Sequence, residues 1–331
     1  MMNGKDTPKR KILVTGGAGY IGSHTVKELV KRGYDVTVLD NLSNGNMISL
    51  DGVKYIEGDI GDYDKVNKLL QFEEIDAVIN FAALAYVGES VSDPRKYYDN
   101  NVVKGKAFLD AVVDSGVKKI VFSSSCATYG IPEKIPISED ERQWPVNPYG
   151  WTKLMFEQMM KDYDEAYGLR YISLRYFNAA GADADGSIGE MHDPETHVIP
   201  ILLQNVLGIR KKFFVFGTDY DTRDGSCIRD YVHVTDLADA HIKAIEYLFE
   251  NEKSDFFNLG TGEGITVLEL IGAVEKITGR KLNVSLEDRR SGDPNALVAD
   301  NTKAKIVLSW NPVHSSIENI IRTAWNWHSR K

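Results

Sequence analysis

Short apolar runs alternate with longer amphipathic stretches along the first half of the chain. Runs rich in Val, Ile and Leu that end at glycine or charged residues are typical of buried strands, whereas apolar residues three and four apart predict helices. The pattern predicts strands at 11–15, 35–39, 53–57, 77–81, 119–124 and 170–175. Between them it predicts helices at 21–32, 63–70, 96–115 and 149–167.

The order of these elements indicates the fold class. Strands that alternate with helices, and that are apolar on nearly every residue, are typical of a parallel sheet covered on both faces. We therefore expect an α/β protein with a doubly wound parallel sheet of the Rossmann type. Its 331 residues are enough for this sheet and a smaller second lobe.

The pattern loosens after Asn178. Residues 181–195 are rich in Gly, Asp and Ala without a period and predict a loop. Beyond it the spacing predicts helices at 198–207, 234–249, 267–278 and 317–327, and strands at 213–216, 256–259 and 283–286. We expect residues 1–178 to form the dinucleotide-binding domain and residues 179–331 to form mainly a mixed, substrate-binding lobe, with some segments returning to the main sheet and a cleft between the two.

A glycine-rich turn follows the first predicted strand. Gly16, Gly19 and Gly22 stand where a helix begins, so that backbone can approach a pyrophosphate and helix N–H groups can point at it. Asp40 ends the second strand, 18 residues after Gly22, where a carboxylate can accept hydrogen bonds from ribose hydroxyls. Because the same charge repels a 2′-phosphate, the pattern predicts NAD rather than NADP.

Tyr149 and Lys153 stand four residues apart in a predicted helix, so their side chains should share one face. A free phenol has a pKa of about 10, and a nearby ammonium favours the phenolate. The pair is therefore a candidate general base, although the same spacing is also common on ordinary helix surfaces.

Composition excludes several other classes of protein. The 39 Lys and Arg against 48 Asp and Glu give a net charge of −9, which argues against a general nucleic-acid or anionic-membrane surface. The two cysteines, Cys126 and Cys227, are too few and too isolated for a disulfide framework or a CxxC metal site. With no apolar leader at residues 1–10 and no run of about 18 apolar residues, we expect a cytoplasmic protein.

No metal site is expected from the sequence. His192 and His197 lie near Asp193 and Glu195, but the seven histidines show neither an HExxH motif nor facial-triad spacing. We interpret this segment as a loop on the substrate side.

Several motifs resemble the extended short-chain dehydrogenase/reductase superfamily over residues 11 to about 327. They are the G-G-x-G-x-x-G turn, Gly58-Asp59-Ile60, Asn80-Phe81-Ala82-Ala83, Ser123-Ser124-Ser125 and Tyr149-x-x-x-Lys153. Further segments resemble the UDP-glucose (UDP-galactose) 4-epimerase family in particular: Val87-Gly88-Glu89-Ser90, Tyr97-Tyr98-Asp99-Asn100-Asn101, Arg175-Tyr176-Phe177-Asn178, Asp224-Gly225 and Arg229-Asp230-Tyr231-Val232-His233-Val234.

The resemblance implies a set of cofactor-binding residues. Asp59 and Ile60 would flank the adenine of NAD, and Tyr176 and Phe177 would lie near the nicotinamide. The full set that the resemblance assigns to NAD is Gly16, Gly19, Tyr20, Ile21, Gly22, Asp40, Asn41, Leu42, Ser43, Asn44, Gly45, Asp59, Ile60, Phe81, Ala82, Ala83, Leu84, Asn100, Ser123, Tyr149, Lys153, Tyr176 and Phe177.

The resemblance also implies the reaction. Tyr149 would take the proton from the C4 hydroxyl of the sugar as a hydride passes to NAD, helped by Ser125, while Lys153 would contact the nicotinamide ribose and hold the phenol's pKa down. The 4-keto sugar would turn over in the site and take the hydride back on its other face. NAD would then be a tightly held catalyst rather than a consumed substrate.

A nucleotide handle fits such a reaction, since the sugar must rotate while a remote group stays anchored. The resemblance assigns UDP-sugar binding to Ser125, Tyr149, Asn178, His197, Val198, Phe214, Val215, Phe216, Arg229, Arg290 and Asp293. It also implies a homodimer through the helices predicted at 96–115 and 149–167. An arginine beside an aspartate, and phenylalanines that alternate along a strand, are equally compatible with a purely structural role.

Three positions depart from the best-known epimerases and leave the sugar open. Ala85 stands where many members carry a lysine, His197-Val198 replaces an Asn-Leu pair, and Leu297 takes the place of a bulky tyrosine. The smaller side chain at 297 suggests that N-acetylated UDP-hexoses are also accepted. Ala85-Tyr86-Val87 and Cys126-Ala127-Thr128 also resemble the UDP-arabinose (UDP-xylose) 4-epimerases, so a pentose substrate stays open.

Three rival functions remain. A nucleotide-sugar 4,6-dehydratase would need Asp-Glu after the active-site hydroxyl, and here Cys126-Ala127 follows Ser125. A net oxidoreductase would accumulate NADH. A catalytically silent NAD-binding protein would have no need of Ser125, Tyr149 and Lys153 together.

Overall fold

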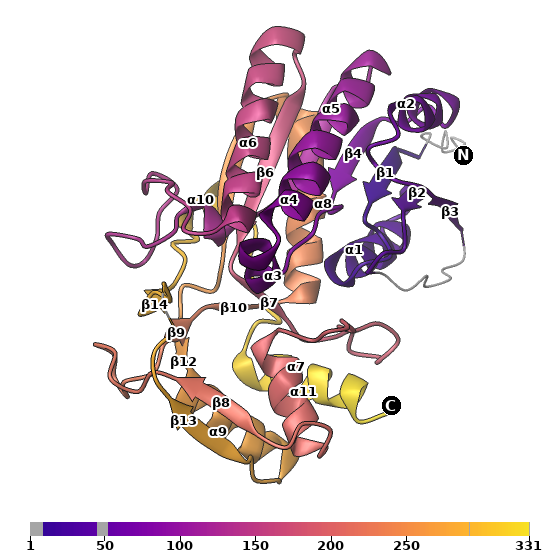
Figure 1. Cartoon of the computed structure of the whole chain (residues 1–331). Helices are drawn as coiled ribbons and strands as arrows, with labels where there is room; N and C mark the ends of the chain where they lie inside the picture. Colours follow the sequence, from indigo (N-terminus) through magenta and orange to yellow (C-terminus); the bar gives the residue numbers. More distant parts are fainter. Residues whose placement is uncertain (1–8, 45–51, 291, 331) are drawn as a thin grey trace.

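A computed structural model describes residues 9–44, 52–290 and 292–330 of the chain. Seven parallel strands form the main sheet in the order β11-β6-β5-β4-β1-β2-β3 (Figure 1). They are β1 Lys11–Thr15, β2 Asp35–Asp40, β3 Val53–Glu57, β4 Ala77–Asn80, β5 Lys119–Ser125, β6 Arg170–Tyr176 and β11 Asp255–Leu259. The doubly wound parallel sheet that the sequence predicts is confirmed.

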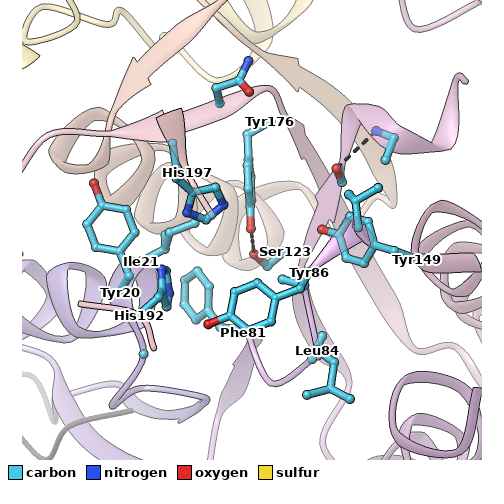
Figure 2. Close-up of a pocket in the computed structure, with 18 of the residues that line it drawn as sticks. Tyr20, Ile21, Phe81, Leu84, Tyr86, Ser123, Tyr149, Tyr176, His192 and His197 are labelled. Carbon is cyan, nitrogen blue, oxygen red and sulfur yellow. Dashed lines mark hydrogen bonds between the residues drawn. The ribbon is translucent and has the colours of Figure 1, made fainter. Parts of the chain in front are cut away.

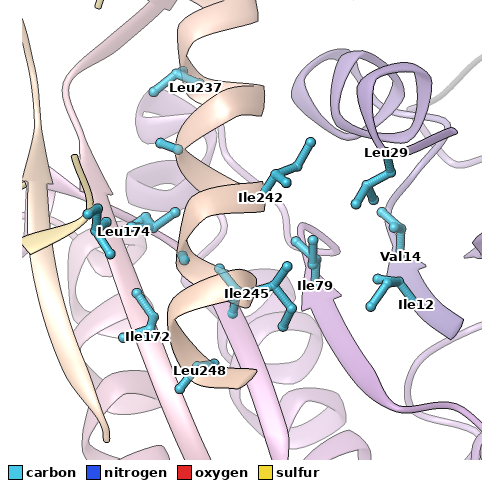
Figure 3. Packing of buried hydrophobic residues seen from close by; sticks show 14 of the residues in the cluster. Ile12, Val14, Leu29, Ile79, Ile172, Leu174, Leu237, Ile242, Ile245 and Leu248 are labelled. Carbon is cyan, nitrogen blue, oxygen red and sulfur yellow. The ribbon is translucent and has the colours of Figure 1, made fainter. Parts of the chain in front are cut away.

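Helices cover both faces of this sheet. Helices α1 (Tyr20–Lys31) and α8 (Val234–Asn251) lie on one face, and α2 (Tyr63–Phe72), α5 (Lys104–Asp114) and α6 (Pro148–Tyr167) lie on the other. Successive residues of β1 alternate between the faces: Ile12 and Val14 belong to the core under α1 and α8 (Figure 3), and Leu13 belongs to the opposite core. Burial on both faces explains why the strands are apolar on nearly every residue.

The single helix predicted at 96–115 is in fact three contiguous segments. They are α4 (Pro94–Tyr97), a π-helix η1 (Tyr98–Val103) and α5. The π-helix carries Asn101, whose amide oxygen accepts from Leu84 N at 2.9 Å and whose amide nitrogen donates to Leu84 O and to Thr152 Oγ1, both at 3.0 Å. A wider turn at this point fixes the segment after β4 to α6, and π-turns of this kind often accompany functional sites.

A smaller lobe lies beyond the carboxyl ends of the main strands (Figure 1). Helices α7 (Val198–Val206), α9 (Val267–Thr278) and α11 (Ile317–His328) surround its apolar core with the parallel pair β8 (Phe213–Phe216) and β13 (Val284–Glu287). Short ladders join this lobe to the sheet: β7 (Asn178–Ala180) pairs with β10 (Tyr231–His233), and β9 (Ile228–Arg229) lies between β12 (Ile265–Thr266) and β14 (Ala296–Leu297).

Two later segments return to the main sheet. Strand β11 pairs in parallel with β6, and α8 contributes Leu237, Ile242 and Ile245 to the core beside α1 (Figure 3). The remaining short helices are α3 (Val87–Ser92), the 3-10 turn η2 (Cys126–Thr128) and α10 (Thr302–Val307). Within the described residues, no helix is long and apolar enough to cross a membrane.

A buried ion pair fastens α6 to the sheet. The Arg175 guanidinium on β6 donates to the Glu157 carboxylate of α6, with Nη2 to Oε2 at 2.6 Å and Nε to Oε1 at 3.0 Å. Ser124 Oγ on β5 donates to the same carboxylate at 2.5 Å, and Arg175 Nη1 donates to Tyr129 OH at 2.9 Å. Both charged side chains are almost fully buried, so each depends on the other.

The variant Glu157→Gln should therefore be strongly destabilised, because it leaves the Arg175 cation buried without a counter-charge. The expected loss in the free energy of unfolding is about 3–5 kcal/mol, measured by urea denaturation. Glu165→Gln on the exposed side of the same helix is the control, with an expected change within about 0.5 kcal/mol. Equal losses in the two variants would show that the ion pair does not fasten α6.

Candidate active site

A cavity of about 590 Å³ lies between the carboxyl ends of the main strands and the smaller lobe (Figure 2). Residues at the ends of β1, β2, β4, β5 and β6 form one wall, and residues of β9, β10 and α7 contribute to the other. An open parallel sheet presents ligands at this edge.

The glycine turn after β1 leaves no room for side chains. A Cβ at Gly16, where φ is +71°, would lie 2.7 Å from Ala82 N, and one at Gly22 would lie 2.2 Å from Gly16 O. Since both neighbours are backbone atoms, they cannot move aside. Helix α1 begins here without a side-chain cap at Gly19, so its first N–H groups remain available to an anion. This cradle fits the pyrophosphate of a dinucleotide.

Asp40 lies at the end of β2 and lines the cavity. Its Oδ2 accepts from Ala18 N at 2.9 Å, and its Oδ1 accepts from Leu42 N at 2.8 Å. Each carboxylate oxygen keeps a second lone pair, so Asp40 can hold the glycine turn in place and still accept a ribose hydroxyl.

Most of the other residues assigned to the cofactor line the same cavity. It brings together Gly16, Gly19, Tyr20, Ile21, Gly22, Asp40, Asn41, Ser43, Asn44, Ile60, Phe81, Ala82, Ala83, Leu84, Asn100, Ser123, Tyr149, Tyr176 and Phe177. Leu42 and Asp59 do not line it. The Asp59 carboxylate instead accepts from Lys104 Nζ at 2.6 Å and from Gly61 N at 2.8 Å, and only its neighbours Gly58 and Ile60 reach the cavity. Gly45 lies outside the described residues.

Tyr149 occupies the first turn of α6. Asn147 caps this helix, because its Oδ1 accepts from Gly150 N at 2.8 Å, and Pro148 follows as the first helical residue. The capped turn places the Tyr149 ring in the cavity (Figure 2). Ser125, the last residue of β5, also lines this cavity. Ser125 Oγ accepts from Ala127 N at 3.1 Å, which orients the hydroxyl.

Burial dominates the titration of Tyr149. The side chain is 7% exposed, and desolvation raises the pKa of its phenol far above the ordinary value. The nearby Tyr176 raises it further, while a hydrogen bond to the Ser125 hydroxyl opposes the rise. By itself, then, the pocket keeps the phenol neutral.

Lys153 lies behind Tyr149 rather than in the cavity lining. Its ammonium donates to Ser123 O at 2.8 Å and lies 4.8 Å from the centre of the Phe122 ring and 5.8 Å from that of Tyr149. Burial lowers the pKa of Lys153 to about 7, although Glu157 opposes this. The amine is therefore only partly charged at neutral pH.

The expectation that Lys153 lowers the pKa of the phenol stays a prediction, and in the protein alone burial dominates both groups. Desolvation of the phenol outweighs other influences, and Lys153 has lost part of its own charge for the same reason. The two groups share one buried site, as the spacing predicts, but the pocket by itself does not create a phenolate.

The residues assigned to the substrate divide into those that line the cavity and those that lie outside it. Asn178, His197, Val198, Arg229 and Asp293 line the cavity together with Ser125 and Tyr149. Asp293 accepts from Arg290 Nε at 2.9 Å and lies 3.7 Å from Arg229 Nη2, so it connects the cavity to Arg290 outside it.

Residues 214–216, which the resemblance assigns to UDP-sugar binding, do not line the cavity. Val215 is 1% exposed within the core of the smaller lobe, because alternation along β8 turns it inward. Phe214 and Phe216 face the opposite way and are partly exposed, with the Arg290 guanidinium 4.8 Å from the centre of the Phe216 ring. Phe216 and Arg290 thus form a rim connected to the cavity through Asp293.

Several lining residues were missed or set aside in the sequence analysis. Tyr86 follows β4 at the carboxyl edge, and its ring lies edge-on to His192 with centroids 5.8 Å apart (Figure 2). Burial opposes charge on His192, but the nearby carboxylates of Glu190 and Glu195 raise its pKa to about 9. Asn147 and Tyr231 also line the cavity. No spacing rule identifies such residues, since they come from segments far apart in the sequence: Tyr86 follows β4, Asn147 precedes α6 and Tyr231 lies on β10.

Comparison with known proteins agrees with this geometry. The model of the NAD dependent epimerase/dehydratase family matches residues 12–260. A UDP-glucose 4-epimerase of Lactobacillus helveticus is 53% identical over 96% of this chain and 97% of its own length. The corresponding enzyme of Rhizobium meliloti is 52% identical, with 97% of each chain covered.

Solved structures extend the likeness to three dimensions. The UDP-glucose 4-epimerase of Brucella ovis, crystallised with NAD, has a TM-score of 0.93 and 50% identity over 96% of this chain and 97% of its own. A UDP-Glc/GlcNAc 4-epimerase of Campylobacter jejuni has a TM-score of 0.86 and 40% identity, covering 97% of this chain and all of its own.

The buried amine of Lys153 predicts a particular dependence of stability on pH. Its pKa of about 7 lies below the value of 10.5 for a free lysine, so the unfolded chain binds more protons between these limits. As the pH rises from about 7 to 10.5, the free energy of unfolding of the wild type should therefore increase relative to that of a Lys153→Met variant. The difference between the two proteins should rise by up to ~1.4 kcal/mol per pH unit.

Urea denaturation of the protein without nucleotide at a series of pH values measures this difference. Lys161→Met, at an exposed position of the same helix, should show a flat difference from the wild type. A flat difference for Lys153→Met would mean that the amine stays charged when the chain folds.

Proposed function

The chain belongs to the NAD-dependent epimerase/dehydratase family, and we propose that it interconverts UDP-glucose and UDP-galactose by inverting C4 of the sugar. The observation that supports this most strongly is a single cavity that holds the dinucleotide cradle at Gly16–Gly22 together with Ser125 and Tyr149. Relatives about half identical over nearly the whole chain share the activity by name.

The residues around the cavity fit NAD. The glycine turn would accept the pyrophosphate and Asp40 the adenosine ribose, and Tyr176 and Phe177 line the cavity together with Ser123 and Ser125. NAD, when bound, supplies a positively charged acceptor that takes a hydride from the sugar carbon and gives it back.

Tyr149 is the group that moves the proton. Its phenolate takes the proton of the C4 hydroxyl, with the Ser125 hydroxyl sharing a hydrogen bond with the same sugar oxygen, and later returns it. Because burial favours the neutral phenol, a nearby positive charge is needed to form the phenolate. Lys153, fixed on Ser123 O, supplies part of it.

The other residues hold the substrate while its sugar turns. Arg229 donates to Ile228 O at 2.8 Å and Pro294 O at 3.0 Å, so its side chain is held at the cavity wall, where it can pair with a pyrophosphate. Asn178 and Asp293 lie on the same side and can hold the nucleotide end. We place Phe216 and Arg290 at the outer rim, where they would contact the nucleoside.

Elimination across C5 and C6 is disfavoured by Cys126. It follows Ser125 where a dehydratase needs a carboxylate, and burial raises the pKa of its thiol to about 12. Neither this neutral thiol nor Ala127 can act as the acid and base of a dehydratase at neutral pH.

We propose that the enzyme accepts more than one UDP-sugar. Leu297 lines the cavity beside Asp293, and Ala85 and Cys126 also line it with small side chains. These positions leave room for an N-acetyl group at C2, and a pentose would fit as well.

One experiment tests both the reaction and its breadth. The protein is incubated with UDP-galactose, UDP-N-acetylgalactosamine and UDP-arabinose in parallel, and the products are separated. We expect C4 epimers of the two hexoses and no accumulating NADH absorbance. Tyr149→Phe should lose about 10²–10⁴-fold in rate and still bind NAD, whereas Tyr167→Phe, at the far end of the same helix, should keep full activity.

The outcomes separate the proposals. Net NADH would indicate an oxidoreductase, and loss of the 6-hydroxyl a dehydratase. Full activity in Tyr149→Phe would remove the proposed base. Turnover of UDP-galactose without UDP-N-acetylgalactosamine would restrict the pocket to simple hexoses, and turnover of UDP-arabinose alone would make the enzyme a pentose epimerase.

We also propose that the protein is a cytoplasmic homodimer. Val103 at the end of η1 is 62% exposed, and Met155 on α6 is 38% exposed, which gives these neighbouring helices an apolar surface. Sedimentation velocity should give twice the 37.0 kDa chain mass, and Val103→Asp should shift the protein toward the monomer. A wild-type monomer would exclude this interface.

A further inference from the structure

Four potential metal ligands meet on the loop that forms one wall of the cavity. Glu190, His192, Glu195 and His197 each place one ligand atom within 4.8 Å of the others. His192 Nδ1 lies 3.1 Å from Glu190 Oε1 and 3.9 Å from Glu195 Oε1. His197 Nδ1 contacts Glu190 Oε1 and lies 3.8 Å from Glu195 Oε1. Two imidazole nitrogens thus converge on two carboxylate oxygens.

The carboxylates of this cluster are buried together. The side chains of Glu190 and Glu195 are each 3% exposed, so two carboxylates are buried side by side. Among the described residues, no lysine or arginine forms an ion pair with either of them. Buried charges are normally paired or bound to a metal ion. Both histidines face these carboxylates, and His192 Nδ1 is buried with no hydrogen-bond partner among the described residues.

One divalent cation would balance both carboxylates and leave both histidines neutral. A tetrahedral zinc site with bonds of 2.0–2.2 Å has ligand atoms about 3.4 Å apart, which the observed separations bracket. Imidazole and carboxylate together are a usual donor set for zinc. We propose that Glu190, His192, Glu195 and His197 bind one Zn²⁺ through two imidazole nitrogens and two carboxylate oxygens.

The surroundings hold the ligands in place. Glu195 Oε1 accepts from the backbone N–H groups of Thr196 and His197, both at 2.8 Å. The loop is also fixed at its carbonyls, since Trp327 Nε1 donates to Glu190 O and Arg210 Nη2 donates to Glu195 O, each at 2.8 Å. Such outer contacts orient metal ligands in known sites.

The site would be structural rather than catalytic, because protein atoms fill all four positions. Zinc would join the two ends of an eight-residue segment, from Glu190 to His197, whose histidines line the cavity. The His192 ring lies edge-on to Tyr20, with centroids 6.3 Å apart, and Tyr20 opens α1 beside the glycine turn (Figure 2). Metal binding would therefore stiffen the substrate wall against the cofactor wall.

The test uses the full-length chain without an affinity tag. After treatment with a chelator, the protein is titrated with ZnCl₂ by calorimetry, dialysed, and analysed for metal by mass spectrometry. We expect one zinc per chain and an increase in melting temperature on binding. Glu190→Gln and His197→Gln should each bind zinc at least ~100-fold more weakly. His314→Gln, which removes an exposed histidine outside the cluster, should bind as the wild type does.

The His197→Gln variant changes an exposed residue, so it keeps the test valid if Glu190→Gln does not fold. No zinc in the wild type would overturn the proposal and mean that protons on the histidines balance the carboxylates. Equal binding by the variants would place the zinc elsewhere. Since no activity is measured, failure here leaves the proposed epimerase function untouched.

Discussion

The chemistry of this protein depends on the burial of one phenol and one amine beneath the carboxyl edge of a parallel sheet. Tyr149 and Lys153 share the first two turns of α6, and both are almost inaccessible to water. Burial disfavours charge on each, so it raises the pKa of the phenol and lowers that of the amine. The pocket by itself therefore keeps the phenol neutral. A bound positive charge can favour its phenolate form.

The rest of the fold holds Tyr149 and Lys153 at the carboxyl edge of the sheet. The ion pair between Glu157 and Arg175 fixes α6 against β5 and β6, one turn beyond Lys153. The glycine turn after β1 opens on the same edge because the strands run parallel and their carboxyl ends meet. A dinucleotide bound at the turn and a base on α6 thus share one cavity although their residues lie over a hundred positions apart in the chain.

The local pattern of apolar residues was enough to predict the main sheet, because its strands are buried on both faces and the helices beside it are strongly periodic. The strands of two or three residues, such as β9 and β14, were missed since they are too short to show alternation. The π-helix at η1 was also missed, and it carries Asn101, whose tertiary contacts with Leu84 and Thr152 cannot be read from local spacing.

The positions of site residues were predictable where a sequence motif determines the backbone conformation. They were less predictable where a side chain can form hydrogen bonds with several alternative partners. Gly16, Asp40 and Ser125 lie at strand ends and reach the cavity as expected. The Asp59 carboxylate instead accepts a hydrogen bond from Lys104. Val215 packs in the core of the smaller lobe, because side chains alternate along β8. The titration of Lys153 follows from depth of burial, which spacing along a helix does not reveal.

The most direct test of this account is the ionisation of Tyr149 with and without NAD. Tyrosinate absorbance is followed against pH for the wild type, and the titration of Tyr149→Phe is subtracted. The account predicts no ionisation of Tyr149 in the protein alone until well above the pKa of free tyrosine, and ionisation at much lower pH once NAD is bound. An unchanged titration with bound NAD would contradict the claim that a bound positive charge turns this buried phenol into a base.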